Sequence, residues 1–410
     1  MLRNIVLFGL VSLYIEMPAS AQDSCLNHAL LQPKSVAQKV QAELLAVKVG
    51  DGGMQPNVPP ETQRLISSFK DSLASATDAY LSCGSGASTD AQAMERDVAA
   101  SVGANGPVSA EQPTAPEPDA TIENVYGANL RLTVKRPENR PELLLVQWSF
   151  NIDCGDDSVL LMYEHQDGRW KRALRWQSAK IESIQEAFGD FFQYSVVPLG
   201  TNGKWAVAVA HGHPWCTSRM SAFDIDVVSP NGEGIPPRVV FHTNYGYSRF
   251  NIEPVMKPRS DGFELRLEVD MMDVDIMTRK GIYRYRTVGN SIVRVQPIAM
   301  NGRDFVDEWL QTKWPDAERW SASDNIVELK ALHTKIERQM SPDAHDWPQF
   351  SYGAVRACKD TPRRFQVEAN EDPGGPLYFQ ILQGANSFTM LAGSSRANPK
   401  CEGADLMQEH

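Results

Sequence analysis

The sequence predicts a mainly β protein. Its central β domain is either propeller-like or a sandwich, and it lies between an N-terminal helical hairpin and a small C-terminal α+β module. Strand pairs joined by Gly and Asn turns recur at intervals of about 35–45 residues within 124–300. Apolar residues recur at helical spacing before this region and again after it. The six cysteines fall in pairs within these segments.

The first residues predict an export signal that is removed. Arg3 precedes a short apolar run, and Ala19-Ser20-Ala21 has the small-x-small form of a cleavage site. We therefore expect loss of residues 1–21 and a secreted or periplasmic protein. An N-terminal anchor is the alternative, but the apolar run is too short to span a bilayer as a stable helix. No later stretch approaches the roughly 18 apolar residues of a transmembrane anchor.

The cysteines predict local disulfides in an oxidising compartment. A structural zinc site would need close Cys-x-x-Cys pairs, and the sequence has none. With every cysteine paired, no thiolate nucleophile is expected. The simplest pairing joins neighbours along the chain: Cys25–Cys83, Cys154–Cys216 and Cys358–Cys401.

Residues 25–83 predict two antiparallel helices. Val40 and Leu44 belong to one apolar stripe at helical spacing, and Phe69 and Leu73 belong to a second. Such a small pair has little core of its own, so a disulfide between its ends is a plausible staple.

Residues 84–122 predict a disordered linker. This segment is rich in Ala, Ser, Gly and Pro and has few large apolar side chains. It therefore buries too little surface to offset the entropy lost on ordering. Prolines near its end stiffen it.

The β region covers residues 124–300. In FELRLEV, the apolar side chains of Phe263, Leu265, Leu267 and Val269 share one face of a strand. Turn sequences that tolerate positive φ separate the strands of each predicted hairpin: Gln166-Asp167-Gly168, Asn202-Gly203 and Gly289-Asn290.

One strand in this region has two unlike faces. WAVAVAHGH places Ala206, Ala208, Ala210 and Gly212 on one side, with Trp, Val and His side chains on the other. A face of Ala and Gly alone predicts a second sheet packed closely against it.

Residues 301–410 predict the α+β module. A short helix is expected around residues 304–311, and a longer one carries an apolar stripe of Ile326, Leu329, His333 and Ile336. Short strands follow, tied by Cys358–Cys401.

The motif HGHPWC at 211–216 raises the question of a metal site. His211 and His213 share one face at a strand end, where Zn²⁺ or Cu²⁺ could bind if His165 or His242 converged on them. The favoured interpretation is structural: a buried strand end closed by the Cys154–Cys216 bridge, with no metal. Asp153 and Asp156 are weaker metal candidates, for Ca²⁺, in NIDCGDDS. The carboxylates of Asp270, Asp273 and Asp275 form a second acidic run.

Known catalytic motifs are absent from the sequence, which has no G-x-S-x-G, H-E-x-x-H, P-loop or G-x-G-x-x-G opening a helix. We therefore expect no catalytic residues and no cofactor. A catalytic pair of carboxylates is not excluded, because the fold brings its two members together and they need no fixed spacing in the sequence. Tryptophans of the β region could stack on a ligand; burial in the core is favoured for Trp148, Trp170, Trp176, Trp205 and Trp215.

The net charge of −11 and the lack of a basic patch argue against a nucleic-acid partner. The sequence therefore predicts an exported, non-catalytic module that binds a protein or glycan or contributes to the cell envelope. A hydrolase with an unrecognised carboxylate site and a divalent-metal binder are the alternatives.

Overall fold

The computed structural model of the chain describes residues 19–48, 58–83, 90–103, 125–153, 155–177, 191–200, 203–213, 220–232, 234–248, 254–273, 276–295, 299, 301–339, 349–385 and 387–407. The predicted mainly β architecture is confirmed. The strands form four antiparallel sheets of four strands each, and neighbours in a sheet are neighbours in the chain.

The chain divides into two compact units, and their limits differ from the predicted segments. One unit comprises Met1–Ala187 with Asn231–Pro237, and the other comprises Phe188–Pro230 with Arg238–His410. The predicted β region at 124–300 is therefore shared. Its first sheet belongs with the N-terminal helices, and its remaining strands belong with the C-terminal module.

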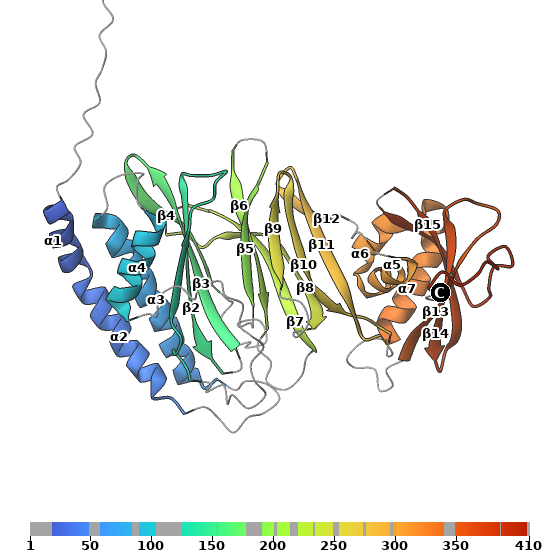
Figure 1. Cartoon of the computed structure of the whole chain (residues 1–410), viewed down its shortest axis with the longest axis horizontal. Helices are drawn as coiled ribbons and strands as arrows, with labels where there is room; N and C mark the ends of the chain where they lie inside the picture. Colours follow the sequence, from blue (N-terminus) through green and yellow to red (C-terminus); the bar gives the residue numbers. More distant parts are fainter. Residues whose placement is uncertain are drawn as a thin grey trace, which may run out of the picture. The chain divides into compact units, whose positions relative to one another are not determined.

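The first unit has four described helices, which cover its sheet in Figure 1. The predicted hairpin at 25–83 contains three of these helices, the first of which begins just before residue 25. There are three rather than two because a turn at Leu30 splits the first expected helix. The predicted disulfide between Cys25 and Cys83 is confirmed. The helices are α1 (Ala19–Ala29), α2 (Leu31–Leu45), α3 (Pro60–Cys83) and α4 (Ala91–Val102).

Helix α4 corrects the prediction of a disordered linker. It begins where the Asp90 side chain accepts a hydrogen bond from the Gln92 amide, and it ends at Gly103 in the left-handed conformation. Its few large apolar residues recur every fourth position and are buried: Met94, Val98 and Val102. The Ala-rich composition concealed this stripe. The rest of the predicted linker lies outside the described residues, apart from Asp90 and Gly103.

The sheet of the first unit packs on α3. Trp148 Nε1 donates to Thr77 Oγ1 at 3.0 Å, and the rings of Phe69 and Phe150 lie 5.0 Å apart. These contacts explain why the sheet groups with the helices. The strands are β1 (Arg131–Lys135), β2 (Leu143–Ile152), β3 (Gly155–Gln166) and β4 (Arg169–Gln177), and the predicted turn at Asp167-Gly168 joins the last two.

Two sheets of the second unit pack face to face over one core, as in a sandwich (Figure 1). The Ala face of β6 lies in that core together with the apolar face of β10, so both predictions for these strands are confirmed. The first sheet contains β5 (Phe192–Pro198), β6 (Trp205–Gly212), β7 (Met220–Ser229) and β8 (Arg238–Ser248). The second contains β9 (Val255–Arg259), β10 (Gly262–Asp270), β11 (Thr278–Val288) and β12 (Ser291–Val295).

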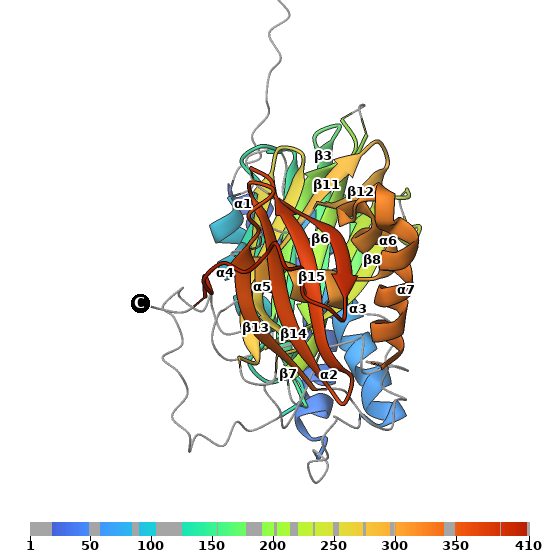
Figure 2. The same ribbon diagram turned by 90° about the vertical axis from the view of Figure 1, so that its right-hand side faces the viewer.

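The C-terminal module is a sheet covered on one face by helices. Figure 2 looks onto this sheet. The predicted stripe of α7 is buried at Leu329, His333 and Ile336, and the Cys358–Cys401 disulfide is confirmed. The helices are α5 (Gly302–Gln311), α6 (Trp314–Ala317) and α7 (Ile326–Gln339). The strands are β13 (Gln349–Ala357), β14 (Arg364–Asp372), β15 (Gly375–Gln383) and β16 (Phe388–Ser394).

Two predictions fall on residues that are not described. Residues 1–18 of the expected signal peptide lie outside the described part, and so do Cys154 and Cys216. The Cys154–Cys216 pairing therefore stays a prediction. Among the described helices, none combines the length and the apolar character needed to cross a membrane.

The Ala face of β6 can be tested by overpacking. Ala208 is fully buried between two sheets, so Ala208→Leu should lower the free energy of unfolding by about 1–3 kcal/mol in urea titrations. The exposed residue Ala397 provides the control, because Ala397→Leu should change stability by no more than about 0.5 kcal/mol. Equal stability of the two variants would contradict close packing at β6.

Candidate functional site

The HGHPWC motif lies at the end of β6, where it meets polar side chains of two neighbouring strands. His211 is only 4% exposed, and β6 pairs it with Asp224 of β7. Two residues further along β7, Asp226 is paired with His242 of β8. We call His211, His213, Asp224, Asp226 and His242 the His–Asp cluster.

Carboxylates join the histidines of this cluster. His213 Nε2 lies 2.9 Å from Asp224 Oδ2, and His242 Nδ1 lies 2.8 Å from Asp226 Oδ1. His211 Nε2 lies 3.7 Å from the other oxygen of Asp226. Burial acts to raise the pKa of Asp226, but its interactions with His211 and His242 outweigh burial and hold that pKa well below its ordinary value. The Asp226 carboxylate is therefore ionised at neutral pH.

The structure separates the metal candidates named from the sequence. His242 joins His211 and His213, whereas His165, Asp153 and Asp156 belong to the other unit. His165 packs on the Trp170 ring, and Asp156 forms an ion pair with Arg131. Within the described ranges, no group of three His, Cys, Asp or Glu side chains is placed to hold a metal ion. The arrangement of the cluster is explained by the pairing of each histidine with a neighbouring carboxylate. The predicted absence of a metal ion stays a prediction.

Asp226 gives the His–Asp cluster a testable acid dependence. Because its pKa is lower in the folded chain than the value of about 3.9 in an unfolded one, its stabilisation is present above about pH 4 and is lost as the pH falls further. Asp226→Asn should therefore lower the free energy of unfolding by about 1–3 kcal/mol at pH 7 and by a smaller amount near pH 2. Glu402→Gln, at an exposed side chain, is the control. An equal loss at both pH values would contradict the ionic role of Asp226.

Buried carboxylates also meet between the central sheets and α5. Asp307 and Glu308 of α5 are buried, and each forms an ion pair with Arg279 of β11. Arg294 of β12, itself buried, forms a second ion pair with Glu308. Both α5 carboxylates thus have arginine counter-ions, which is the arrangement of a structural network. A pair of glycosidase type instead keeps its two carboxyl groups facing a gap that admits substrate.

Asp270, at the end of β10, lies beside this network. Its Oδ1 atom is buried and has no hydrogen-bond partner among the described residues. Burial and the nearby charges of Asp307 and Glu268 raise the pKa of Asp270 to about 7. Asp273 has a structural role instead, because its carboxylate accepts hydrogen bonds from the amides of Ile276 and Tyr352. Asp275, the third member of the predicted acidic run, is not described.

Asp270 should make the protein less stable as the pH rises. Its pKa is higher in the folded chain than in the unfolded one, so stability is lost as the pH rises from about 4 to about 7. Asp270→Asn should abolish that loss and add about 1 kcal/mol at pH 8, after allowance for solvent screening, but nothing at pH 4. Urea titrations at both pH values measure this, with the exposed change Asp324→Asn as control. A gain at pH 4 would contradict the titration of Asp270.

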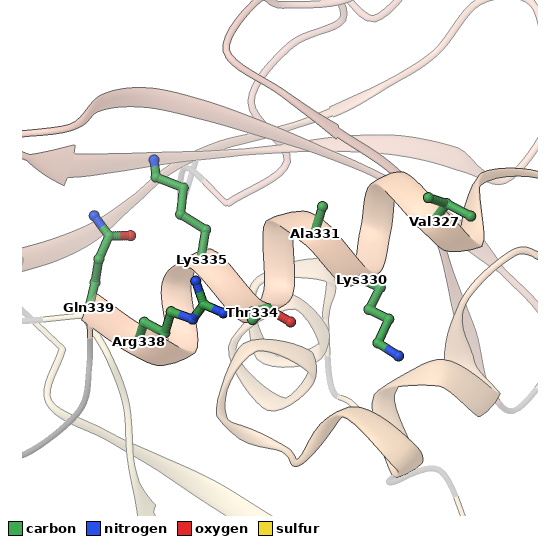
Figure 3. A pocket seen from close by; sticks show the side chains of 7 residues that line it. All are labelled: Val327, Lys330, Ala331, Thr334, Lys335, Arg338 and Gln339. Carbon is green, nitrogen blue, oxygen red and sulfur yellow. The ribbon is translucent and has the colours of Figure 1, made fainter.

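Among the described residues, side chains of α7 line a groove on the outer face of this helix. Figure 3 shows its seven side chains spaced along the helix, and the groove has a volume of about 650 Å³. Its apolar part includes Val327, which is 73% exposed, and Ala331. We call these residues the α7 groove: Val327, Lys330, Ala331, Thr334, Lys335, Arg338 and Gln339.

Contacts on both sides of α7 fix the groove in place. On the buried side, His333 Nε2 lies 2.8 Å from the Thr312 carbonyl oxygen, and burial lowers the pKa of this histidine. Toward the sheet, Gln339 Nε2 donates to Oε1 of the buried Glu371 at 2.5 Å, and Lys335 Nζ lies 3.7 Å from Glu371 Oε2. Sequence analysis identified only the buried stripe of α7. The groove could have been predicted from the positions on the other face of this helix: 327, 330, 331, 334 and 338.

The described tryptophans of the β sheets lie in the core. The predicted burial of Trp148, Trp170, Trp176 and Trp205 is confirmed, since none is more than 8% exposed. Trp215 lies outside the described residues. Stacking on sugar rings needs exposed aromatic faces, so these four residues do not support a glycan site.

The sequence matches no protein-family model and no curated protein. Arguments about function therefore rest on the geometry of the sites themselves.

Proposed function

We propose that the protein is an exported, non-catalytic module that binds another protein through the α7 groove. The observation that carries this proposal is the exposed, partly apolar face of a helix whose opposite face is held in the core. Val327 and Ala331 form a small apolar strip on this face, and charged side chains flank it. A helix face is also a common element of protein recognition.

Export is supported by two independent features. The N-terminal residues have the order of a cleaved signal peptide, with Arg3, an apolar run and Ala19-Ser20-Ala21. The described disulfides, Cys25–Cys83 and Cys358–Cys401, are of the kind that persists in oxidising compartments.

A binding role fits the ionisable clusters better than catalysis does. The His–Asp cluster consists of His–carboxylate pairs, and Asp307 and Glu308 are matched by two arginines. Catalytic acids and bases instead need to reach a substrate, whereas these charged groups are paired with one another. A protein partner is favoured over a glycan because the groove offers aliphatic and charged groups rather than aromatic rings.

Site-specific photo-cross-linking in the native host tests the proposal. A benzoylphenylalanine residue at Ala331, and separately at Thr334, should give an adduct with the same protein, and the exposed position Ala397 should give none. Val327→Trp, at a largely exposed side chain, should abolish the adduct by filling the groove. Equal adducts at Ala397, adducts that survive Val327→Trp, or no adduct at either groove position would refute the proposal.

A further inference from the structure

We infer that the occupant of the α7 groove is an acidic, amphipathic segment of another protein. This inference rests on the proposed function and adds the chemistry of the partner. Three basic side chains, Lys330, Lys335 and Arg338, line the groove beside Val327 and Ala331. The chain as a whole has a net charge of −11, but the α7 groove is lined by cations.

Helix geometry sets the spacing of the partner's charges. Lys330 and Arg338 are eight residues apart, which corresponds to about 12 Å along the helix axis. Neither has a carboxylate partner among the described residues, whereas Lys335 lies near Glu371. Carboxylates of the partner should therefore pair with Lys330 and Arg338, near the two ends of the groove. An apolar side chain of the partner would rest on Val327 and Ala331, on either side of Lys330 along the helix.

Other anionic occupants fit the groove less well. Glu328 and Glu337 are exposed on the same helix, so two anions lie among its three cations. Nucleic acids and anionic membranes are attracted by clustered positive charge, and carboxylates within the cluster repel their phosphates. An acidic peptide that places its charges individually can avoid Glu328 and Glu337.

A second copy of this chain is disfavoured as occupant by symmetry. In a two-fold dimer the same patch lies on both sides of the interface. The groove lining of one copy, which has three cations and no carboxylate, would then face an identical lining of the same sign. Complementary charge is what steers and fixes a specific complex, so the partner should carry the opposite sign.

The size of the groove predicts a weak, salt-sensitive complex. Helix α7 has 14 residues and is therefore about 21 Å long, so a segment lying on it buries less than the roughly 1,600 Å² of a standard interface. We expect a Kd in the micromolar range or above. Exposed ion pairs are screened by salt, so binding should weaken as the ionic strength rises.

Fluorescence anisotropy with the full mature chain tests the inference. The probe is a labelled helical peptide of repeating Glu-Ala-Leu-Glu units, compared with a peptide in which Gln replaces every Glu. The acidic peptide should bind saturably, and the Gln peptide at least tenfold more weakly. Lys330→Glu with Arg338→Glu should weaken the acidic peptide by at least tenfold. The matched control is Lys359→Glu with Arg396→Glu, at exposed side chains outside the groove, which should have little effect.

Several outcomes would overturn the acidic partner. These are no binding of the acidic peptide, equal binding of the Gln peptide, equal effects of the two double variants, or tighter binding of inorganic polyphosphate or phosphatidylglycerol vesicles. If cross-linking at Ala331 still gives a groove-specific protein adduct, only the acidic character of the partner fails. If that adduct is missing as well, the proposed function fails too.

Discussion

The second unit depends on a buried charge network between the central sheets and helix α5. Arg279 and Arg294 come from β11 and β12, and Asp307 and Glu308 come from α5. Removing each charge from water costs several kcal/mol, which only pairing offsets. Loss of one member would leave an uncompensated charge in the core. The sheets and the C-terminal helices therefore have to form together, consistent with their membership of one compact unit.

The position of the α7 groove follows from this network through a short series of contacts. The network fixes α5, and the carbonyl oxygens of Trp309 and Thr312, at and just beyond the end of α5, lie within hydrogen-bond distance of His333. His333 belongs to the buried stripe of α7, so its contacts set which face of α7 points outward. Lys330 and Arg338 are exposed because Leu329, His333 and Ile336 are not.

Features that depend on one segment at a time could be predicted from the sequence, and features that depend on strand pairing could not. The alternation in FELRLEV, the buried stripe of α7 and the pairing of Cys25 with Cys83 all follow from local patterns. Asp224, Asp226 and His242 join His211 only because three strands pair in one register. The Arg–carboxylate network likewise joins residues 14 to 29 positions apart. Helix α4 was missed because its composition, rather than its periodicity, guided the prediction.

The contacts that order the groove also limit what it can recognise. Glu371 holds Gln339 and lies near Lys335, so the C-terminal part of the groove is fixed before any partner arrives. This preorganisation reduces the conformational entropy lost on binding. It also means that a partner carboxylate at Lys335 competes with Glu371, whereas at Lys330 and Arg338 it meets no described carboxylate. Specificity therefore depends on Lys330 and Arg338, which have no ion-pair partner among the described residues, with Val327 and Ala331 supplying an apolar contact beside Lys330.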